Sequence, residues 1–531
     1  MTLELAATGT ARKPLPRTAV TVARSAAGRI LPPSAVLALA AWLRFRDLTS
    51  VGFNSDEAVY TGSAQALAGH TGLESMFPVF RAHPILVQLV IAQALRISDS
   101  DWSARAVTAG FGVAAVGLTY LLGRRLYGPA GCAAAGLLAV MPYHVTVSRE
   151  VLLDGPMTCF GVLCLYCLAR ATADAPRRWA MAAGAALGLA ALCKETSAVW
   201  VGSVFVFGAM GSAGRLKARH LLPGLAVFTG VFVAYPLAVR MAGASGTSQN
   251  FLLWQLLRRA NHPLWFYFTA LPGSVGVAVL VLALLGLVIR RRLLGWRERL
   301  LLAWIAVPVV FFTLWPVKGY QYLLPTAPAL AVLAAIPVAA LWDAREWPRT
   351  RRGPAAPNPA LRRAARCAAP ALALAAMATL LVPTWRQINP SDSTGFLAGT
   401  GGLPGGREAG RWIAVHLPRG SRLLGGGPSI ANVLEYYSDR EVGALSVSSD
   451  PRDRNPVYRP VPNPDLAVRR GEYQYLVWDS YTAARTPYFA SELEKLVNRY
   501  HGVAVYTGTV MVATKLGPAP VPVIVVYEVH P

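Results

Sequence analysis

The sequence predicts an α-helical polytopic membrane protein, followed by a water-soluble α/β domain at its C-terminal end. Hydrophobic residues make up 54% of the 531 residues and charged residues only 15%, against roughly 25% charged in soluble domains. Apolar runs of roughly 20 residues, the length that crosses a bilayer, alternate with short gaps in which the charges collect. Four such runs are Ala130–Val147, Leu221–Val239, Leu271–Ile289 and Tyr322–Trp342.

The positive charge is concentrated in the gaps between apolar runs. A net charge of +24 at first suggests nucleic-acid binding. The basic residues instead occupy short loops between spans, which is the pattern of cytoplasmic loops beside an anionic leaflet. We therefore expect the lipid bilayer as a partner and no nucleic acid. The basic loops are Arg124–Arg125, Arg177–Arg178, Arg215–Arg219, Arg290–Arg292 and Arg345–Arg366.

Residues 1–30 predict a basic cytoplasmic tail. They do not fit a cleaved signal peptide, because the first apolar segment begins only at Leu31. The first span, about Leu31–Phe45, then leads outward. The segment Arg46–Ser100 is too polar to span and stays outside, where its amphipathic stretches Ala58–Leu67 and Ile85–Leu95 predict helices on the membrane surface.

Continued alternation of spans gives about eleven of them over residues 31–385. The second span, about Trp102–Leu122, returns to the inside, and the last, about Ala368–Val382, leaves the remainder outside. This threading predicts a multi-pass protein of the plasma (inner) membrane. Its N-terminus is expected in the cytoplasm and its C-terminal domain outside it.

Residues 386–531 predict a soluble α/β domain, which follows a linker at Ser391–Gly406. The run Gly425-Gly426-Gly427 before a helix could cradle a phosphate. It lacks the partners of a nucleotide-binding fingerprint, and we interpret it as a tight turn. The expected helices are Arg407–His416, Ser429–Tyr437 and Pro487–Tyr500, and the expected strands are Arg422–Leu424, Tyr473–Trp478, Val503–Thr507 and Val521–Val526.

The six cysteines lie in or beside apolar runs, and none lies in the C-terminal domain. The sequence therefore predicts no disulfide framework. Cys164 and Cys167 have the spacing of a redox or zinc motif, but they lie inside a span with no second ligand pair nearby. We interpret them as small apolar core residues.

Two adjacent acids follow the first span in the sequence Asn54-Ser55-Asp56-Glu57. One interpretation is a helix start, with Asn54 or Ser55 as the cap and the acids at the positive end of the helix dipole. The other is a general base or a metal ligand. Adjacent side chains on a helix point about 100° apart, so we expect Asp56 and Glu57 to have different roles. Tyr60 lies one turn after Asp56 and shares its face.

A second polar motif, Ser148–Asp154, lies where the third predicted span turns back into the fourth. Glu150 and Asp154 are four residues apart and repel each other on a helix unless a cation such as Arg149 joins them. The motif is either an interfacial ion cluster or a carboxylate that positions a sugar, a metal or another acid.

Lys194 and Lys318 each follow a span that leads outward. They are either lysines that extend to the interface or cations that hold a lipid phosphate as point charges. Tyr320 and Tyr322 suit an aromatic belt in both cases. His83 begins a predicted surface helix, where a single histidine also has a purely structural interpretation. The threading places all of these residues outside, which suggests one active site at the outer membrane face.

Taken in order, these motifs resemble those of the GT-C membrane glycosyltransferases of the protein O-mannosyltransferase and aminoarabinose-transferase type, which are glycosyltransferase family 39-like. The resemblance covers roughly residues 30–385. The residues that carry it are Asp56-Glu57, His83-Pro84-Ile85, Ser148-Arg149 with Leu153-Asp154, Lys194, and Lys318 with Tyr322-Leu323-Leu324-Pro325 and Pro328.

The resemblance implies transfer of a sugar, with inversion, from a polyprenyl-phosphate donor to an acceptor protein, lipid or glycan outside the membrane. Asp56 would be the catalytic base, and Glu57 and Asp154 would assist it by binding substrate or a divalent metal. The donor phosphate would be held by Arg149, Lys194 and Lys318. The remaining candidates for substrate binding are Tyr60, His83, Glu150, Tyr320 and Tyr322.

Two other functions compete with this hypothesis. A transporter or lipid flippase would place ionisable residues near the midplane and often contains internal repeats, whereas here the acids lie at the outer edge and no repeat is evident. A scaffold that displays the C-terminal domain would leave the outer cluster of acids and lysines unexplained.

Overall fold

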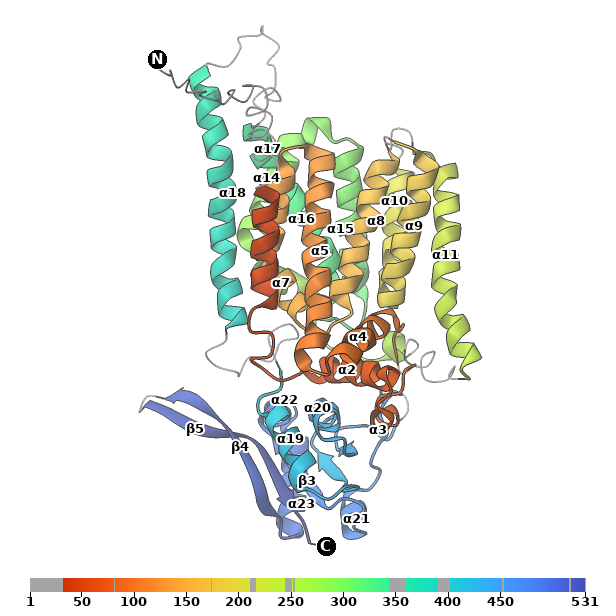
Figure 1. The fold of residues 1–531 in the computed structure, drawn as a ribbon, viewed down its shortest axis with the longest axis vertical. Helices are drawn as coiled ribbons and strands as arrows, with labels where there is room; N and C mark the ends of the chain where they lie inside the picture. Colours follow the sequence, from red (N-terminus) through yellow and green to blue (C-terminus); the bar gives the residue numbers. More distant parts are fainter. Residues whose placement is uncertain are drawn as a thin grey trace, which may run out of the picture.

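The structure, a computed structural model, describes residues 32–80, 82–172, 174–210, 216–243, 251, 254–342, 359–389, 402–450, 453–514 and 517–530. The predicted tail 1–30 and most of the predicted basic loop and linker lie outside these ranges. Figure 1 shows a bundle of long helices, a thin layer of helices lying across one end of it, and a C-terminal domain beyond that layer. The site described below lies where these three parts meet.

The bundle consists mainly of long helices that stand roughly parallel, together with shorter helices, some of which bend away from that direction (Figure 1). They are residues 32–45, α5 (Asp101–Tyr127), α6 (Ala130–Val140), α7 (Pro142–Arg149), α8 (Asp154–Ala171), α9 (Pro176–Cys193), α10 (Val199–Ala209), α11 (Ala218–Met241), α13 (Phe266–Val275), α14 (Val277–Arg290), α15 (Trp296–Leu314), α16 (Ala327–Ala334), α17 (Ile336–Trp342) and α18 (Pro359–Ile388). Short 3-10 helices connect some of them: η1 (Glu195–Ala198), η2 (Arg291–Leu293) and η3 (Tyr320–Thr326).

Within the described ranges, 4 helices are long and apolar enough to cross a membrane, and the number rises to 6 if each of two bent helix pairs forms one span. The chain is therefore a multi-pass membrane protein, and the figure of about eleven spans stays a prediction. The continuous helices are Asp101–Tyr127, Arg219–Met241, Tyr320–Trp342 and Arg363–Ile388.

The two bent pairs interrupt apolar runs that look continuous in the sequence. Helices α6 and α7 meet at 58°, where Pro142 occupies the first position of α7 because it has no N–H to donate. Helices α13 and α14 meet at 99° around Gly276, whose φ is 92°. Only glycine adopts that conformation readily. A side chain there would also collide with Leu380.

The layer across the bundle end contains α2 (Ser55–Ala68), α3 (Thr71–Glu74) and α4 (Leu86–Ile97). Of the two amphipathic stretches predicted in the outer segment, Ala58–Leu67 lies within α2, and Ile85–Leu95 lies in α4 except for Ile85, which precedes the helix. Asn54 caps α2, since its side chain accepts a hydrogen bond from the Glu57 amide while the Glu57 carboxylate accepts one from the Asn54 amide. This capping box fixes where the helix begins and so where Asp56 lies.

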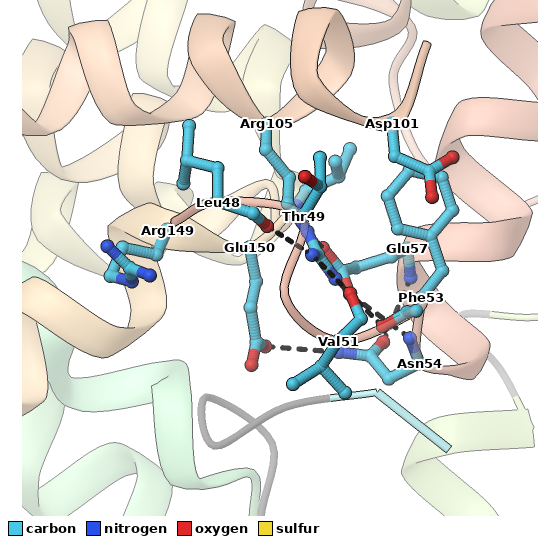
Figure 2. Close-up of polar contacts among 12 residues, drawn as sticks. Leu48, Thr49, Val51, Phe53, Asn54, Glu57, Asp101, Arg105, Arg149 and Glu150 are labelled. Carbon is cyan, nitrogen blue, oxygen red and sulfur yellow. Dashed lines mark hydrogen bonds and ion pairs between the residues drawn. The ribbon is translucent and has the colours of Figure 1, made fainter. Parts of the chain in front are cut away.

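A buried ion pair joins this layer to the bundle, as Figure 2 shows. Glu57 is 0% exposed, and both its oxygens accept from Arg105 of α5 at 2.7 Å. Glu57 also accepts from the Val151 amide at 2.9 Å. The remaining Arg105 N–H groups donate to carbonyls of the loop before α2, including those of Val51 at 2.8 Å and Gly52 at 3.0 Å. Two charges thus hold the loop, α5 and the turn before α8 in one arrangement.

The C-terminal part folds around a five-stranded sheet with the strand order β2-β1-β3-β5-β4. Strand β1 is parallel to β2 and β3, and β5 is antiparallel to β3 and β4. The strands are β1 (Leu423–Gly425), β2 (Val442–Ala444), β3 (Tyr475–Asp479), β4 (Val503–Thr514) and β5 (Gly517–Glu528). The helices are α19 (Gly406–His416), α20 (Pro428–Ser438), α21 (Pro464–Arg469), α22 (Ser480–Arg485) and α23 (Pro487–Arg499).

Helix α20 attaches the C-terminal domain to the same outer segment. The Tyr437 hydroxyl donates to Asp101 at 2.8 Å and accepts from the Phe53 amide at 3.0 Å. Asn432 donates to the Ser55 hydroxyl at 2.9 Å. A single buried apolar cluster continues from the bundle through Phe53 into the C-terminal domain. Phe53 and Ser55 lie on either side of Asn54, the residue that caps α2. The C-terminal domain is therefore docked beside Asp56.

We expect Glu57→Gln to destabilise the fold. The change leaves the buried Arg105 without its counter-charge, and breaking a buried ion pair costs about 3–5 kcal/mol. Thermal unfolding of the purified protein should show a midpoint several degrees lower. Glu74→Gln, which removes an exposed acid from α3, is the matched control and should leave the midpoint unchanged. An unchanged midpoint in Glu57→Gln together with lost activity would instead support a direct catalytic role for Glu57.

Candidate functional site

Asp56 opens into a cavity of about 660 Å³ between the outer layer, the bundle and the C-terminal domain. Asp56 is exposed because its side chain borders this cavity. Protein nevertheless surrounds the cavity on several sides. Burial in this setting raises the pKa of Asp56 above its usual value of 3.8, the charges of Lys194 and His83 counteract the rise, and Glu57 adds to it. Asp56 thus combines access with a perturbed pKa, as expected of a functional carboxylate.

A second carboxylate, Asp154, forms a buried ion pair with Lys194. Lys194 follows α9 and donates to both Asp154 oxygens at 2.8 and 3.1 Å. The two residues are 1% and 3% exposed. The ammonium also lies 4.8 Å from the centre of the Tyr322 ring. The sequence predicted both residues as site members, and the structure places them together, with the lysine charge neutralised by the acid.

His83 lies beside this cluster and is fixed by an acid that the motifs did not single out as a site residue. Its Nδ1 is 3.0 Å from each carboxylate oxygen of Glu195. The ring makes edge contacts with Phe251 at 5.2 Å and with Tyr60 at 6.0 Å between centroids. Glu195 directly follows Lys194, and its side chain is 16% exposed. The signal for it in the sequence was the charged pair Lys194-Glu195 at the end of an apolar run.

Two cations line the cavity from the bundle side. Lys318 is 2% exposed, and its Nζ donates to the Trp315 carbonyl at 2.9 Å. Arg258 is half-buried and stacks on Trp254 at 4.5 Å. No acid pairs with either cation within the described ranges. An ammonium has three donors and a guanidinium five, so both retain capacity to bind an anion. Sequence reasoning missed Arg258, which follows a short helical segment that carries no motif.

Arg149 does not line this cavity, and its expected phosphate-binding role stays a prediction. Its guanidinium donates to the carbonyls of Leu43 at 2.8 Å and Arg46 at 2.7 Å. These carbonyls lie at the C-terminal end of the first helix, where unpaired acceptors need donors. The arginine of the Ser148-Arg149 motif therefore closes that helix. Glu150 accepts from the Asn54 side chain at 3.1 Å, so it supports the cap of α2.

The tentative metal ligands Glu57 and Asp154 each have a cationic partner. Arg105, Asn54 and the Val151 amide occupy both oxygens of Glu57, and Lys194 occupies those of Asp154. Among the residues that the structure describes, no group of three or more His, Cys, Asp or Glu side chains is arranged to hold a metal ion. A metal at either carboxylate would compete with its cation for the same oxygens.

Of the three candidate tyrosines, one lines the cavity and two contact other residues of the site. Tyr320 lines the cavity and contacts Tyr143 edge to face, with ring centroids 4.9 Å apart. Tyr322 packs beside Lys194 and Phe312. Tyr60 contacts His83 edge to face. The predicted residues therefore form one connected group around Asp56, with Arg149 and Glu150 at its structural edge.

Comparison with known proteins gives matches to one group of membrane enzymes. The family described as "Dolichyl-phosphate-mannose-protein mannosyltransferase" matches residues 82–239. A curated relative from Pseudomonas fluorescens, an undecaprenyl phosphate-alpha-4-amino-4-deoxy-L-arabinose arabinosyl transferase, is 29% identical over 46% of this chain and 47% of its own length. The enzyme of the same name from Serratia proteamaculans is 28% identical over 29% of each chain. The chain thus spans at most about half the length of these two relatives.

Solved structures extend the likeness to nearly the whole chain. ArnT from Cupriavidus metallidurans in the apo state has a TM-score of 0.66 at 16% identity, covering 94% of this chain and 98% of ArnT. A second ArnT structure, bound to undecaprenyl phosphate, gives 0.61 at 17% identity over the same shares. An oligosaccharyltransferase from Archaeoglobus fulgidus gives 0.58 at 14% identity over 93% of this chain and 74% of its own. This chain has the fold of the GT-C membrane glycosyltransferases, and the resemblance to that group indicated by its sequence motifs is confirmed.

Proposed function

We propose that the protein transfers a sugar from a polyprenyl phosphate to an acceptor hydroxyl, with Asp56 as the catalytic base. The observation that carries the proposal is the cavity itself, which brings an accessible carboxylate of raised pKa together with two cations that have no acidic partner in the described ranges. A reaction in which a phosphate leaves and a hydroxyl loses its proton needs both features. The ArnT complex with undecaprenyl phosphate supports this class of donor.

In the proposed step, the acceptor oxygen attacks the anomeric carbon of the donor sugar, and the bond between that carbon and the phosphate oxygen breaks. Asp56 takes the proton of the attacking hydroxyl. The electron pair of the broken bond stays on the phosphate, whose growing charge is met by Lys318 and Arg258. Displacement from the opposite face inverts the anomeric centre.

The other acids of the site have supporting roles in this proposal. Glu57 fixes the first turn of α2 and hence Asp56, while Asp154 and Glu195 hold Lys194 and His83 near it. The charges of Lys194 and His83 lower the pKa of Asp56. Of the three cations that the motifs suggested for the phosphate, Lys318 keeps that role, and Arg258 is added to it.

We further propose that the cavity faces the outside of the plasma (inner) membrane. Helix α5, which is 27 residues long, begins at Asp101 beside the C-terminal domain and carries Arg124 and Arg125 in its last turn. Positive-inside orientation puts those arginines in the cytoplasm and the C-terminal domain outside. A transporter is the alternative, and it would move its substrate without cleaving the bond between sugar and phosphate.

Asp56→Asn should abolish transfer without unfolding the protein. Loss of a general base costs about 10²–10⁴-fold in rate, and asparagine suits the first turn of a helix. The measurement follows release of radiolabelled sugar from polyprenyl-phosphate donors in membranes that contain the wild-type or variant protein. Glu74→Gln is the control acid and should keep the wild-type rate. Wild-type turnover by Asp56→Asn would refute the assigned role of Asp56.

On acidification, the transfer rate should begin to fall at a higher pH than it would if the base were an aspartate with its usual pKa. The base acts only when deprotonated, and its pKa lies above 3.8, so the acidic limb of kcat/KM should have its midpoint above that value. Because the positive charge of His83 lowers the pKa of Asp56, His83→Gln should move the limb to still higher pH. If the acidic limb does not move in His83→Gln, the charge of His83 does not act on the base.

Lys318→Gln and Arg258→Gln should each weaken donor binding. Hydrogen bonds to charged groups contribute about 1.5–3 kcal/mol, so the Kd for polyprenyl phosphate should rise by about tenfold or more in each variant. Equilibrium binding of radiolabelled polyprenyl phosphate measures this directly. Arg149→Gln serves as the comparison, since its guanidinium lies outside the cavity lining. An effect confined to Arg149 would move the phosphate site to the end of the first helix.

A further inference from the structure

The C-terminal domain directs the binding edge of its sheet at the cavity that holds Asp56. Strand β1 connects through α20 to β2 on one side, and β3 pairs with β1 on the other side. In open parallel sheets, this change of direction marks where ligands bind, outside the carboxyl ends of the strands. The residues that follow these three strands and line the cavity are Pro428, Ser429, Ser446, Val447, Tyr481 and Arg485.

The position of this edge is fixed at two points close to Asp56. Asn432 of α20 donates to Ser55, the residue before Asp56, at 2.9 Å. The Leu403 amide donates to the Phe53 carbonyl at 3.2 Å. The sheet edge and the carboxylate therefore belong to one rigid arrangement, and a molecule that touches the edge lies within reach of Asp56.

Helix α22 presents one cation to the cavity from this edge. Asp479, at the end of β3, caps the helix by accepting from the Thr482 amide at 2.7 Å. Arg485 lies in the last turn of α22, with its guanidinium 5.0 Å from the Tyr481 ring centre. Arg454 reaches the same cavity from the segment between β2 and α21.

These two arginines give the C-terminal side of the cavity a positive charge. No ion pair joins either of them to an acid in the chain as described. The one acid among the cavity-lining residues on this side is Asp453. The positive charge also acts on His262. Partial burial lowers the pKa of His262, and the charges of Arg485 and Lys318 lower it further. Cations converge here from both domains.

We propose that this side of the cavity binds the acceptor, and that Arg454 and Arg485 bind a phosphate group that the acceptor carries near its reactive hydroxyl. This inference rests on the proposed function. Lys318 and Arg258 serve the donor phosphate from the bundle side, which leaves the arginines of the C-terminal domain for a second anion. The site thus selects phosphorylated sugars, whether free or part of a lipid headgroup.

The test compares the double variant Arg454→Ala/Arg485→Ala with Arg419→Ala/Arg469→Ala. The second pair removes the same charge from exposed positions of the C-terminal domain that do not line the cavity. The probes are octyl glucoside 6-phosphate, neutral octyl glucoside and glucose 6-phosphate. Equilibrium binding to the full-length protein is measured with excess polyprenyl phosphate, so that the donor side is occupied. Thermal unfolding verifies that every variant is folded.

Wild type and the control pair should bind octyl glucoside 6-phosphate at least tenfold more tightly than octyl glucoside, and Arg454→Ala/Arg485→Ala should lose that preference. If glucose 6-phosphate binds as tightly as octyl glucoside 6-phosphate, the proposal is supported and the acceptor is a free sugar phosphate. If only octyl glucoside 6-phosphate binds tightly, the proposal is supported and the acceptor is a lipid. A wild type without preference, or a cavity variant that keeps it, would overturn the proposal. Binding requires no turnover, so failure of Asp56-dependent transfer would overturn the proposed function alone.

Discussion

The ion pair between Glu57 and Arg105 is the constraint on which the site depends. Both charges are buried, so neither is tolerable without the other, and their remaining hydrogen bonds fix the loop before α2 and the turn before α8. Asp56 follows directly from this, because it is the neighbour of Glu57 on the same helical turn. Two adjacent acids thus divide their work: one is held by a cation inside the protein, and the other faces the cavity.

The distribution of charge around Asp56 follows a consistent logic. Acids inside the bundle neutralise Lys194 and His83, and the cations that lack acids line the cavity. A cation that is already neutralised by a carboxylate adds little to the free energy of phosphate binding, whereas an unpaired cation adds a charge-assisted hydrogen bond. Pairing therefore separates residues that shape the site from residues that bind ligands. This is why Lys194 and Lys318, which look alike in the sequence, differ in the roles we assign to them.

The sequence could predict features set by composition and local pattern. The basic loops and apolar runs indicated a multi-pass protein, and the order of short motifs indicated its fold. In the C-terminal domain, the predicted strands overlap β1, β3, β4 and β5. What it could not predict depends on contacts distant in the chain. Arg105 gave no local signal because its partner lies 48 positions away. The 99° break at Gly276 lies inside a mainly apolar run that we assigned to a single span, although Pro272 and Gly273 precede it.

The docking of the C-terminal domain explains why the two halves of the cavity belong to one chain. The proposed base, Asp56, lies on α2 and the proposed acceptor wall on the C-terminal sheet, and the hydrogen bond from Asn432 to Ser55 joins them one residue from Asp56. Rates of group transfer depend steeply on the position of the reacting atoms, with effective molarities of about 10⁵–10⁸ M for well-oriented groups. A wall tethered only by a flexible linker could bind the same acceptor without orienting its hydroxyl. Under the proposed function, docking at Ser55, Phe53 and Asp101 therefore makes the C-terminal domain part of the catalytic geometry.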